Sequence, residues 1–496
     1  MLERLAPTGS GFPTAYIGDH ALHSRYNPLA EAERYINSLR FREGVRFFIL
    51  LEPALGYIAR TLREKFPDTV ILTLHVSDFF SGNETGPVNA AFTDAVWSPG
   101  SGEPLARFLE DHIPDTEAAS VAIVEWRPAQ AAFGGAYLSL LAETVEYLKR
   151  ADANKRTVDN FGRRWFRNVF KNLRLLKKSL RYYPFSSPIV ITGAGPGLEE
   201  TIPLLAEQKK YSSLFVLAVS SSVPALLAGG LRPDLVLTTD GGNWALLHLY
   251  EALRPGGEIP AFAAGITAAL PSQFAGLSWL PISDGSLWQN LLLQSTGLPF
   301  AALPQRGTVT AAALDLAFTL SRGPVYITGA DLGHRDIQTH ARPYSFERLL
   351  TERASRLNPS YSQTFVRASA IAASGSHGIY AQWFARQMAA YPDRLFSLGN
   401  NSSVFDKHST GIFPRKLMPV KDFPVEIVIP DDKPSAETAP AVLLRALESG
   451  ETRKTLLGEL GPLLFPGNSP ASAGGPKVSP EKVREEIYAA CGVGYG

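Results

Sequence analysis

A glycine-rich turn is the first place where residue types and spacing could do chemistry. Gly193-Ala194-Gly195-Pro196-Gly197 follows the apolar run Ile189–Thr192 and precedes a segment of helical pattern. Glycine lets a backbone approach a ligand closely, and a helix N-terminus presents N–H groups and partial positive charge. We therefore predict that Gly193, Gly195, Pro196 and Gly197 bind the phosphate of a nucleotide. The dinucleotide fingerprint lacks its third glycine and its acidic ribose partner, so NAD is disfavoured.

A carboxylate and an imidazole form the second candidate pair. Asp331 follows the apolar run Val325–Thr328, and His340 comes nine residues later. An imidazole with an ordinary pKa near 6.5 is suited to general-base chemistry at neutral pH. We predict that His340 is the base and that Asp331 either orients it or is itself the base. A single histidine is equally often structural, so that interpretation stays open.

Further polar residues follow other predicted strands or begin a helix. Ser221 follows the run Leu214–Val219, and Asp240 follows Leu235–Thr239. Gly307 and Thr308 precede an apolar helical segment. These four are candidate contacts to the base, ribose or phosphate of a nucleotide, although serine and threonine there could simply cap helices.

The elements that would position these residues belong to an α/β protein. In an open parallel sheet, ligands bind beyond the carboxyl ends of the strands, where the loops 193–197, 220–222, 240–243, 305–310 and 329–340 would gather. We predict a Rossmann-like sheet of six or seven strands. The expected division is an N-terminal α/β domain at 1–135, connecting helices at 136–183, the Rossmann-like domain at 184–405 and a mostly helical segment at 406–496. A linker at Pro466–Pro476 is expected to be mobile.

Composition excludes several classes of protein. The 496 residues carry a formal net charge of +1 and one cysteine, so no nucleic-acid partner, internal disulfide or cysteine metal cluster is expected. No apolar run reaches the length of a membrane span, and no signal-peptide pattern opens the chain. We expect a cytoplasmic protein without a metal or bound cofactor. A P-loop and a Gly-x-Ser-x-Gly elbow are both absent.

The predicted helix at 136–181 has one basic face. Its members are Arg163, Arg164, Arg167, Lys171, Arg174, Lys177, Lys178 and Arg181. Such a face is commonly just solvated, and the alternative is a surface for an acidic partner or anionic ligand.

An ordered set of motifs resembles a known family. The set consists of Ile191–Glu199, Leu231–Asp234 with Asp240, Gly307–Ala317, Gly329–Leu332 with Thr339-His340-Ala341, and upstream His23–Pro28 and Trp165 with Asn168 and Asn172. In this order the motifs resemble the motility-associated factor (Maf) proteins, flagellin glycosyltransferases that carry the DUF115 domain. The resemblance covers about residues 20–405.

The resemblance implies a function and a fold. Such proteins transfer a nonulosonic acid, of the pseudaminic or legionaminic type, from a CMP-activated donor to Ser or Thr of flagellin, and their central domain is similar to metal-independent sialyltransferases. Two departures matter: Gly197 stands where the family usually has Ser, and Leu51–Tyr57 replaces a Gly-rich strand end, which puts a ligand pocket there in question. The alternatives are a non-catalytic flagellin-associated nucleotide-binding scaffold and an enzyme like 6-hydroxymethylpterin pyrophosphokinase, which shares the Gly-Ala-Gly-Pro turn.

Overall fold

The computed structural model describes residues 3–81, 89–211, 214–254, 260–373, 376–399, 424–430, 438–466 and 478–491. Most of the linker predicted at 466–476 lies outside these ranges. The chain forms two units, one of residues 1–162 with 461–479 and one of residues 163–460 with 480–496. The helices α6 (Gly135–Leu175) and α16 (Gly450–Leu464) contribute residues to both units.

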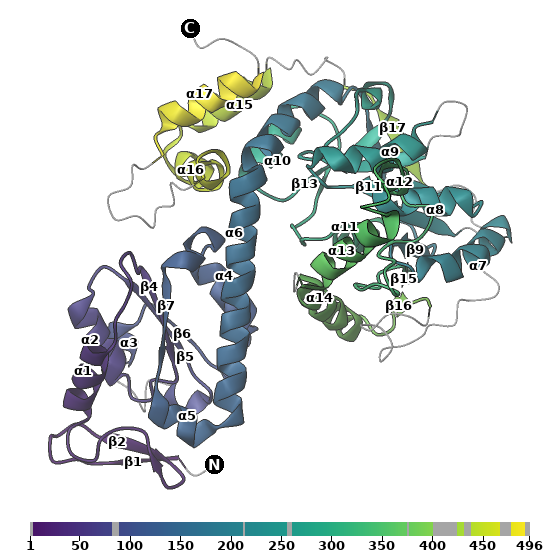
Figure 1. The fold of residues 1–496 in the computed structure, drawn as a ribbon. Helices are drawn as coiled ribbons and strands as arrows, with labels where there is room; N and C mark the ends of the chain where they lie inside the picture. Colours follow the sequence, from purple (N-terminus) through teal and green to yellow (C-terminus); the bar gives the residue numbers. More distant parts are fainter. Residues whose placement is uncertain are drawn as a thin grey trace. The chain divides into compact units, whose positions relative to one another are not determined.

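The first unit is built on a parallel sheet with strand order β6-β5-β4-β7. Its strands are β4 (Phe47–Leu51), β5 (Val70–Leu74), β6 (Ala95–Trp97) and β7 (Val121–Glu125). Its helices are α1 (Pro28–Ser38), α2 (Tyr57–Lys65), α3 (Asn89–Phe92), α4 (Leu105–His112), α5 (Arg127–Phe133) and the first part of α6. Every residue of β4 is buried, and α1 and α2 lie on one side of the sheet (Figure 1). The α/β class expected for the N-terminal part of the chain is confirmed.

The opening of this unit adds elements that the sequence did not reveal. Strands β1 (Glu3–Ala6), β2 (Thr14–Ile17) and β3 (His20–Ala21) form a small antiparallel sheet. The His23–Pro28 motif then begins α1, where Asn27 Oδ1 accepts a hydrogen bond from the Ala30 N–H. This part of the motif is therefore a helix cap.

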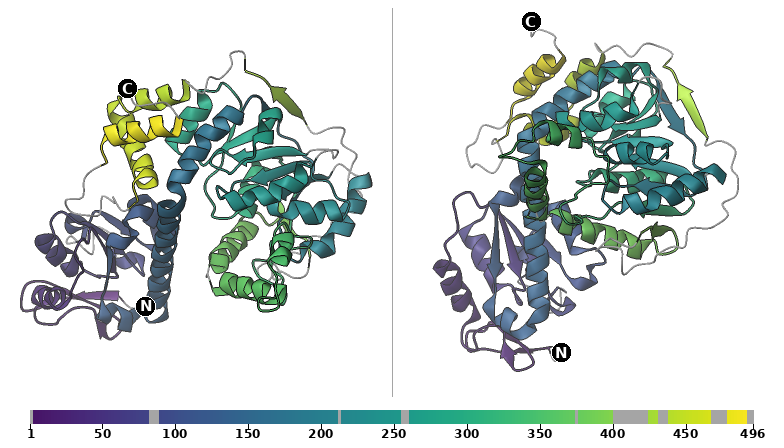
Figure 2. Two further views of the ribbon diagram at one scale, coloured as in Figure 1. Left: turned by 45° about the horizontal axis from the view of Figure 1, so that its top comes forward. Right: turned by 45° about the vertical axis from the view of Figure 1, so that its right-hand side comes forward.

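The second unit holds a ten-stranded sheet in the order β16-β15-β9-β10-β11-β12-β13-β8-β17, with β14 beside β13. The strands are β8 (Ser179–Tyr182), β9 (Ile189–Thr192), β10 (Phe215–Val219), β11 (Leu235–Thr238), β12 (Ala261–Gly265), β13 (Trp279–Ser283), β14 (Ala301–Ala302), β15 (Val325–Thr328), β16 (Leu395–Ser397) and β17 (Val425–Val428). All pairings are parallel except that of the edge strand β17 with β8 (Figure 2). The predicted Rossmann-like parallel sheet is confirmed.

The predicted size of this sheet was too small. The helix expected to reach about residue 181 ends at Leu175, and β8 follows it. Strand β12 has the sequence Ala-Phe-Ala-Ala-Gly, whose small residues have weak strand propensity. Strands β8 and β12 form because they pair with neighbouring strands of the sheet. The local sequence pattern gives no sign of this pairing.

The helices of this unit connect its strands and form its C-terminal part. They are α7 (Leu198–Tyr211), α8 (Val223–Ala228), α9 (Leu246–Ala252), α10 (Leu287–Gln294), α11 (Val309–Leu320), α12 (Glu347–Glu352), α13 (Ser360–Ala373), α14 (Ser376–Ala390), α15 (Thr438–Ala446), α16 (Gly450–Leu464) and α17 (Pro480–Cys491). The helical C-terminal region is as predicted. Within the described ranges, every helix is too short or too polar to traverse a lipid bilayer.

Candidate functional site

The carboxyl ends of β9 and β15 mark the point where the strand order of the second unit reverses. From β9, later strands continue on one side through β10 to β13, whereas β15 and β16 lie on the other side. Ligands of open α/β sheets bind at such a switch point. The turn Gly193–Gly197 follows β9 and the segment Gly329–Asp331 follows β15, so the structure brings these two predicted loops together.

The glycines of the turn allow the two loops to touch. A β-carbon on Gly193 would overlap the carbonyl group of Gly329, and one on Gly195 would overlap the carboxylate of Asp331. The Gly195 N–H donates to the Gly329 carbonyl at 2.7 Å, and the Gly197 N–H donates to Asp331 Oδ2 at 3.0 Å. Close packing between the strand-end loops is therefore what requires glycine here.

These contacts change the role expected for the turn. The sequence assigned the N–H groups of Gly195 and Gly197 to a phosphate, but in the structure both donate within the protein. Pro196 has no N–H to offer. The turn remains at the switch point, and the predicted phosphate donors in it are already occupied.

Asp331 is partly buried against the turn. Burial raises the pKa of its carboxyl, and the hydrogen bonds from the backbone N–H groups of Gly197 and of Asp331 itself oppose that rise. A carboxyl with a raised pKa is closer to the range of a base that works at neutral pH. The carboxylate of Asp331 accepts a hydrogen bond from the Gly197 N–H. The ring of His340 contacts Thr339 and Tyr344.

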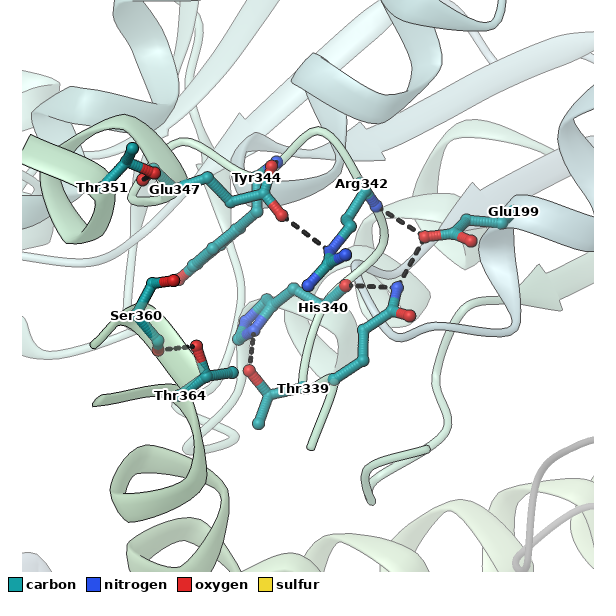
Figure 3. A network of polar contacts seen from close by, with 10 residues as sticks. Glu199, Thr339, His340, Arg342, Tyr344, Glu347, Thr351, Ser360 and Thr364 are labelled. Carbon is teal, nitrogen blue, oxygen red and sulfur yellow. Dashed lines mark hydrogen bonds and ion pairs between the residues drawn. The ribbon is translucent and has the colours of Figure 1, made fainter. Parts of the chain in front are cut away.

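A network of polar contacts ties the loop that carries His340 to the first turn of α7 (Figure 3). Glu199 accepts hydrogen bonds from Gln338 Nε2 at 2.6 Å and from the Arg342 N–H at 2.7 Å. Gln338 Nε2 also donates to the His340 carbonyl at 2.9 Å. The Ala341 N–H donates to a carbonyl of the glycine-rich turn at 2.8 Å. The sequence had no way to assign this role to Glu199 and Gln338, because their partners are far away along the chain.

The His340 ring has two well-defined neighbours. Its Nδ1 lies 2.9 Å from Thr339 Oγ1, and its face stacks on the ring of Tyr344 with centroids 4.1 Å apart and planes 19° apart (Figure 3). Tyr344 is buried, and burial raises its pKa to about 12 although the Arg367 charge opposes the rise. Tyr344 is thus a neutral platform that fixes the plane of the imidazole.

Ser221 and Asp240 lie at the carboxyl ends of β10 and β11, the strands that continue from β9. Ser221 is partly exposed, and its neighbour Ser222 makes the buried contacts of that turn. Asp240 is exposed, and its Oδ1 accepts the Gly242 N–H at 2.7 Å. Both predicted residues therefore lie along the carboxyl edge of the sheet.

Gly307 and Thr308 stand at the start of α11. Gly307 has a φ of 74°, and Thr308 is the N-cap residue but makes no side-chain hydrogen bond to the helix. Because α11 connects two parallel strands, it runs antiparallel to them and its N-terminus lies at the carboxyl edge. This helix start thus offers backbone N–H groups that no side-chain cap of Thr308 occupies.

The last part of α6 holds the loops after β11 and β12 in place. Asn172 Nδ2 donates to the carbonyls of Ile266 and Ala268, both at 2.8 Å, and Asn168 Nδ2 donates to that of Thr267 at 2.9 Å. The ring of Trp165 fills the space where Gly241 would carry a side chain. These motif residues act as supports for the carboxyl-edge loops.

The basic face of α6 is partly used inside the chain. Arg163 lies 3.7 Å from Glu486 of α17, Arg174 donates to the Cys491 carbonyl, and Lys171 donates to the Leu270 carbonyl at 2.9 Å. At these positions the positive charges stabilise the second unit.

A hollow of about 810 Å³ lies elsewhere in this unit, against the ends of α8 and α9. Tyr344 and Ser345 contribute to its wall, but none of the site residues predicted from the sequence lines it. The hollow therefore adjoins the His340 loop through Tyr344, although the residues predicted to bind the nucleotide do not line it.

One comparison with known proteins covers the region of the switch point. Residues 163–336 match the family described as 6-hydroxymethylpterin diphosphokinase MptE-like. This range begins at the supporting part of α6 and ends just beyond Asp331. It covers the glycine-rich turn, Ser221, Asp240 and Thr308.

Two relatives are uncharacterized proteins of Treponema pallidum (strain Nichols). One is 28% identical over 290 residues, which are 57% of this chain and 62% of that protein. The other is 23% identical over 218 residues, which are 42% of this chain and 73% of that protein. The match thus spans less than two thirds of the first relative.

A solved structure is also similar. It is the Maf glycosyltransferase from Magnetospirillum magneticum AMB-1, with a TM-score of 0.46 and 16% identity over 67% of this chain and 60% of that one. The name given to that structure is that of the family which the sequence motifs resemble. A likeness with this TM-score carries no conclusion about the fold or the substrate of this chain.

The close contact between Gly193 and Gly329 predicts that a side chain at position 193 destabilises the second unit. We expect Gly193→Ala to destabilise the second unit by about 1–3 kcal/mol or more, because the new methyl group meets backbone that cannot rotate away. Amide hydrogen exchange of β9 and β15 measures the effect. Gly276→Ala is the control, since an added β-carbon there meets no atom within 4 Å. Equal protection in both variants would contradict the packing role of Gly193.

Proposed function

We propose that this chain is a glycosyltransferase that moves a nonulosonic acid from a CMP-activated donor to Ser or Thr hydroxyls of flagellin in the cytoplasm. The observation that carries the proposal is the meeting of the glycine-rich turn, Asp331 and the His340 loop at a switch point of a parallel sheet. The motif resemblance supplies the identity of donor and acceptor.

The departing CMP phosphate needs electrostatic stabilisation in this reaction. The start of α11, with Gly307 and Thr308, has the uncapped N–H groups and the partial positive charge for it. Gly195 and Gly197 shape the proposed nucleotide site because their N–H groups hold the loop of Asp331 against the glycine-rich turn. Ser221 and Asp240, along the same edge, are assigned to the base or ribose.

The acceptor hydroxyl must lose a proton as it attacks the anomeric carbon. We assign this task to His340, whose imidazole is held by Thr339 and stacked on Tyr344. Asp331 is the second candidate base. No metal requirement is predicted for this chemistry, and activity measured in a chelator tests that point.

The match of residues 163–336 favours one further candidate function. A 6-hydroxymethylpterin diphosphokinase would transfer a diphosphate group from ATP, and the matched range includes the uncapped start of α11, where a phosphate could bind. A flagellin-associated scaffold that binds a nucleotide without turnover remains the third candidate.

Calorimetry separates these functions. We expect the full chain to bind CMP without magnesium and to bind ATP or GTP much more weakly. Incubation with a CMP-activated nonulosonic acid and flagellin should then add the mass of the sugar to flagellin. Magnesium-dependent ATP binding with diphosphate transfer to a pterin would replace the proposal by the kinase. CMP binding without any mass change would favour the scaffold.

A further inference from the structure

Arg367 is a partly buried cation in contact with the platform that carries His340. It lies on α13, and its Nη2 donates to the Tyr344 hydroxyl at 2.7 Å. Its guanidinium carbon lies 5.1 Å from the ring centroids of both Tyr344 and Phe346. Figure 3 shows Ser360 and Thr364 of the same helix beside this loop.

This guanidinium forms no ion pair with any described residue. The carboxylates of α12 form ion pairs with other arginines. Glu347 pairs with Arg342 at 2.8 Å, and Glu352 pairs with Arg348 at 2.8 Å. An arginine has five N–H donors in a planar fork, and the Tyr344 hydroxyl takes one of them. A partly buried charge without a counter-charge is costly, which points to an anionic partner that arrives from outside.

The described aromatic rings around Arg367 carry no negative charge. His248 contacts Tyr344 and Phe346 and bonds Ser345 Oγ at 3.0 Å. Burial first, and then the Arg367 charge, lowers the pKa of His248 to about 4, so that ring is neutral at pH 7. Neutral aromatic rings beside a guanidinium whose other N–H groups make no hydrogen bond to a described residue form a receptor for an oxyanion.

We propose that Arg367 binds an oxyanion of the donor substrate and thereby places the reacting sugar beside His340. This inference rests on the proposed function, and it assigns Arg367 as a specificity-determining residue. Two groups of the donor share the required chemistry: the carboxylate of the acidic sugar and the phosphate of CMP. Tyr344 contacts both His340 and Arg367, so either group would be held close to the candidate base.

The test compares Arg367→Met with the unchanged chain in binding cytidine, CMP and CMP-N-acetylneuraminic acid, which has the carboxylate of the proposed donor class. Loss of a charge-assisted contact should weaken binding by about 10- to 100-fold. If the sugar carboxylate is bound, the loss appears for CMP-N-acetylneuraminic acid alone. If Arg367 binds the phosphate, the loss of affinity appears for CMP as well. In both cases the affinity for cytidine is unchanged.

Three controls keep the result interpretable. Arg348→Met removes the same charge from an exposed side chain of α12 and should change no affinity. Arg367→Lys keeps the positive charge without the planar guanidinium, so its affinity for the donor should lie between that of the unchanged chain and that of Arg367→Met. Tyr344→Phe removes the hydroxyl that Arg367 contacts but keeps the ring and the guanidinium, so it should weaken binding less than Arg367→Met does. A loss on Tyr344→Phe without a loss on Arg367→Met would overturn the proposal.

A separate arm distinguishes this inference from the proposed function. Free N-acetylneuraminate and inorganic phosphate should raise the unfolding temperature of the unchanged chain more than that of Arg367→Met. If the unchanged chain binds no cytidine nucleotide but shows this difference, the transferase proposal fails and the oxyanion receptor stands. Equal affinities and equal stabilisation in both chains would overturn the receptor itself.

Discussion

Replacing His340 by asparagine is expected to lower the rate of sugar transfer by about 10² or more while CMP affinity stays within a few-fold. Asparagine is close in size and can keep a contact with Thr339, but it cannot accept a proton near pH 7. Stacking on Tyr344 shows that the imidazole is held in one plane, as a base must be before it meets the acceptor. Single-turnover transfer from a CMP-activated donor to flagellin measures the rate, and calorimetry measures CMP binding.

The same substitution at His334 is the matched control. His334 lies in the same loop but is exposed, so His334→Asn should change neither transfer nor CMP affinity. Near-normal transfer by His340→Asn would remove His340 from the mechanism. Asp331, whose carboxyl has a raised pKa because it is buried, would then be the base to substitute next.

Glu52→Gln is expected to destabilise the first unit by about 1–3 kcal/mol, the cost of leaving a buried hydrogen-bonding group without a partner. Glu52 and His75 are fully buried at the carboxyl ends of β4 and β5, with 2.9 Å between Glu52 Oε1 and His75 Nδ1. Glu52 Oε2 accepts the Val76 N–H at 2.6 Å and Oε1 accepts that of Ala54 at 3.3 Å. An amide has one oxygen, so its NH₂ group would face one of these donors.

Hydrogen exchange of the β4 and β5 amides measures this loss within the first unit. Glu64→Gln on α2 is the control, because Glu64 forms an exposed pair with Arg60 worth about 0.3–0.5 kcal/mol. A change below about 1 kcal/mol for Glu52→Gln would show that the pair is not needed for stability. The same geometry explains the departure from a Gly-rich strand end: Glu52 and Ala54 have φ of 44° and 49°, and buried side chains fill that turn.

The local sequence predicted the elements whose signal lies within a few residues. Ile189–Thr192 and Val325–Thr328 became the strands β9 and β15 with the predicted bounds, because continuous apolar runs between turn residues are typical of buried parallel strands. The sequence also predicted that the loops after these strands gather at the carboxyl edge of the sheet, since this is a general property of parallel sheets.

What the sequence by itself determined is therefore the α/β class, the strands at the switch point and the residue types that meet there. Only the tertiary structure decided what those residues contact. The Gly197 N–H, expected to bind phosphate, donates to Asp331, which is 134 positions away along the chain. Arg367 reaches Tyr344 from a separate helix, and Glu199 holds a loop that follows β15. Hydrogen bonds and buried charges depend on distances between strands and helices, and no periodicity of the local sequence encodes those distances.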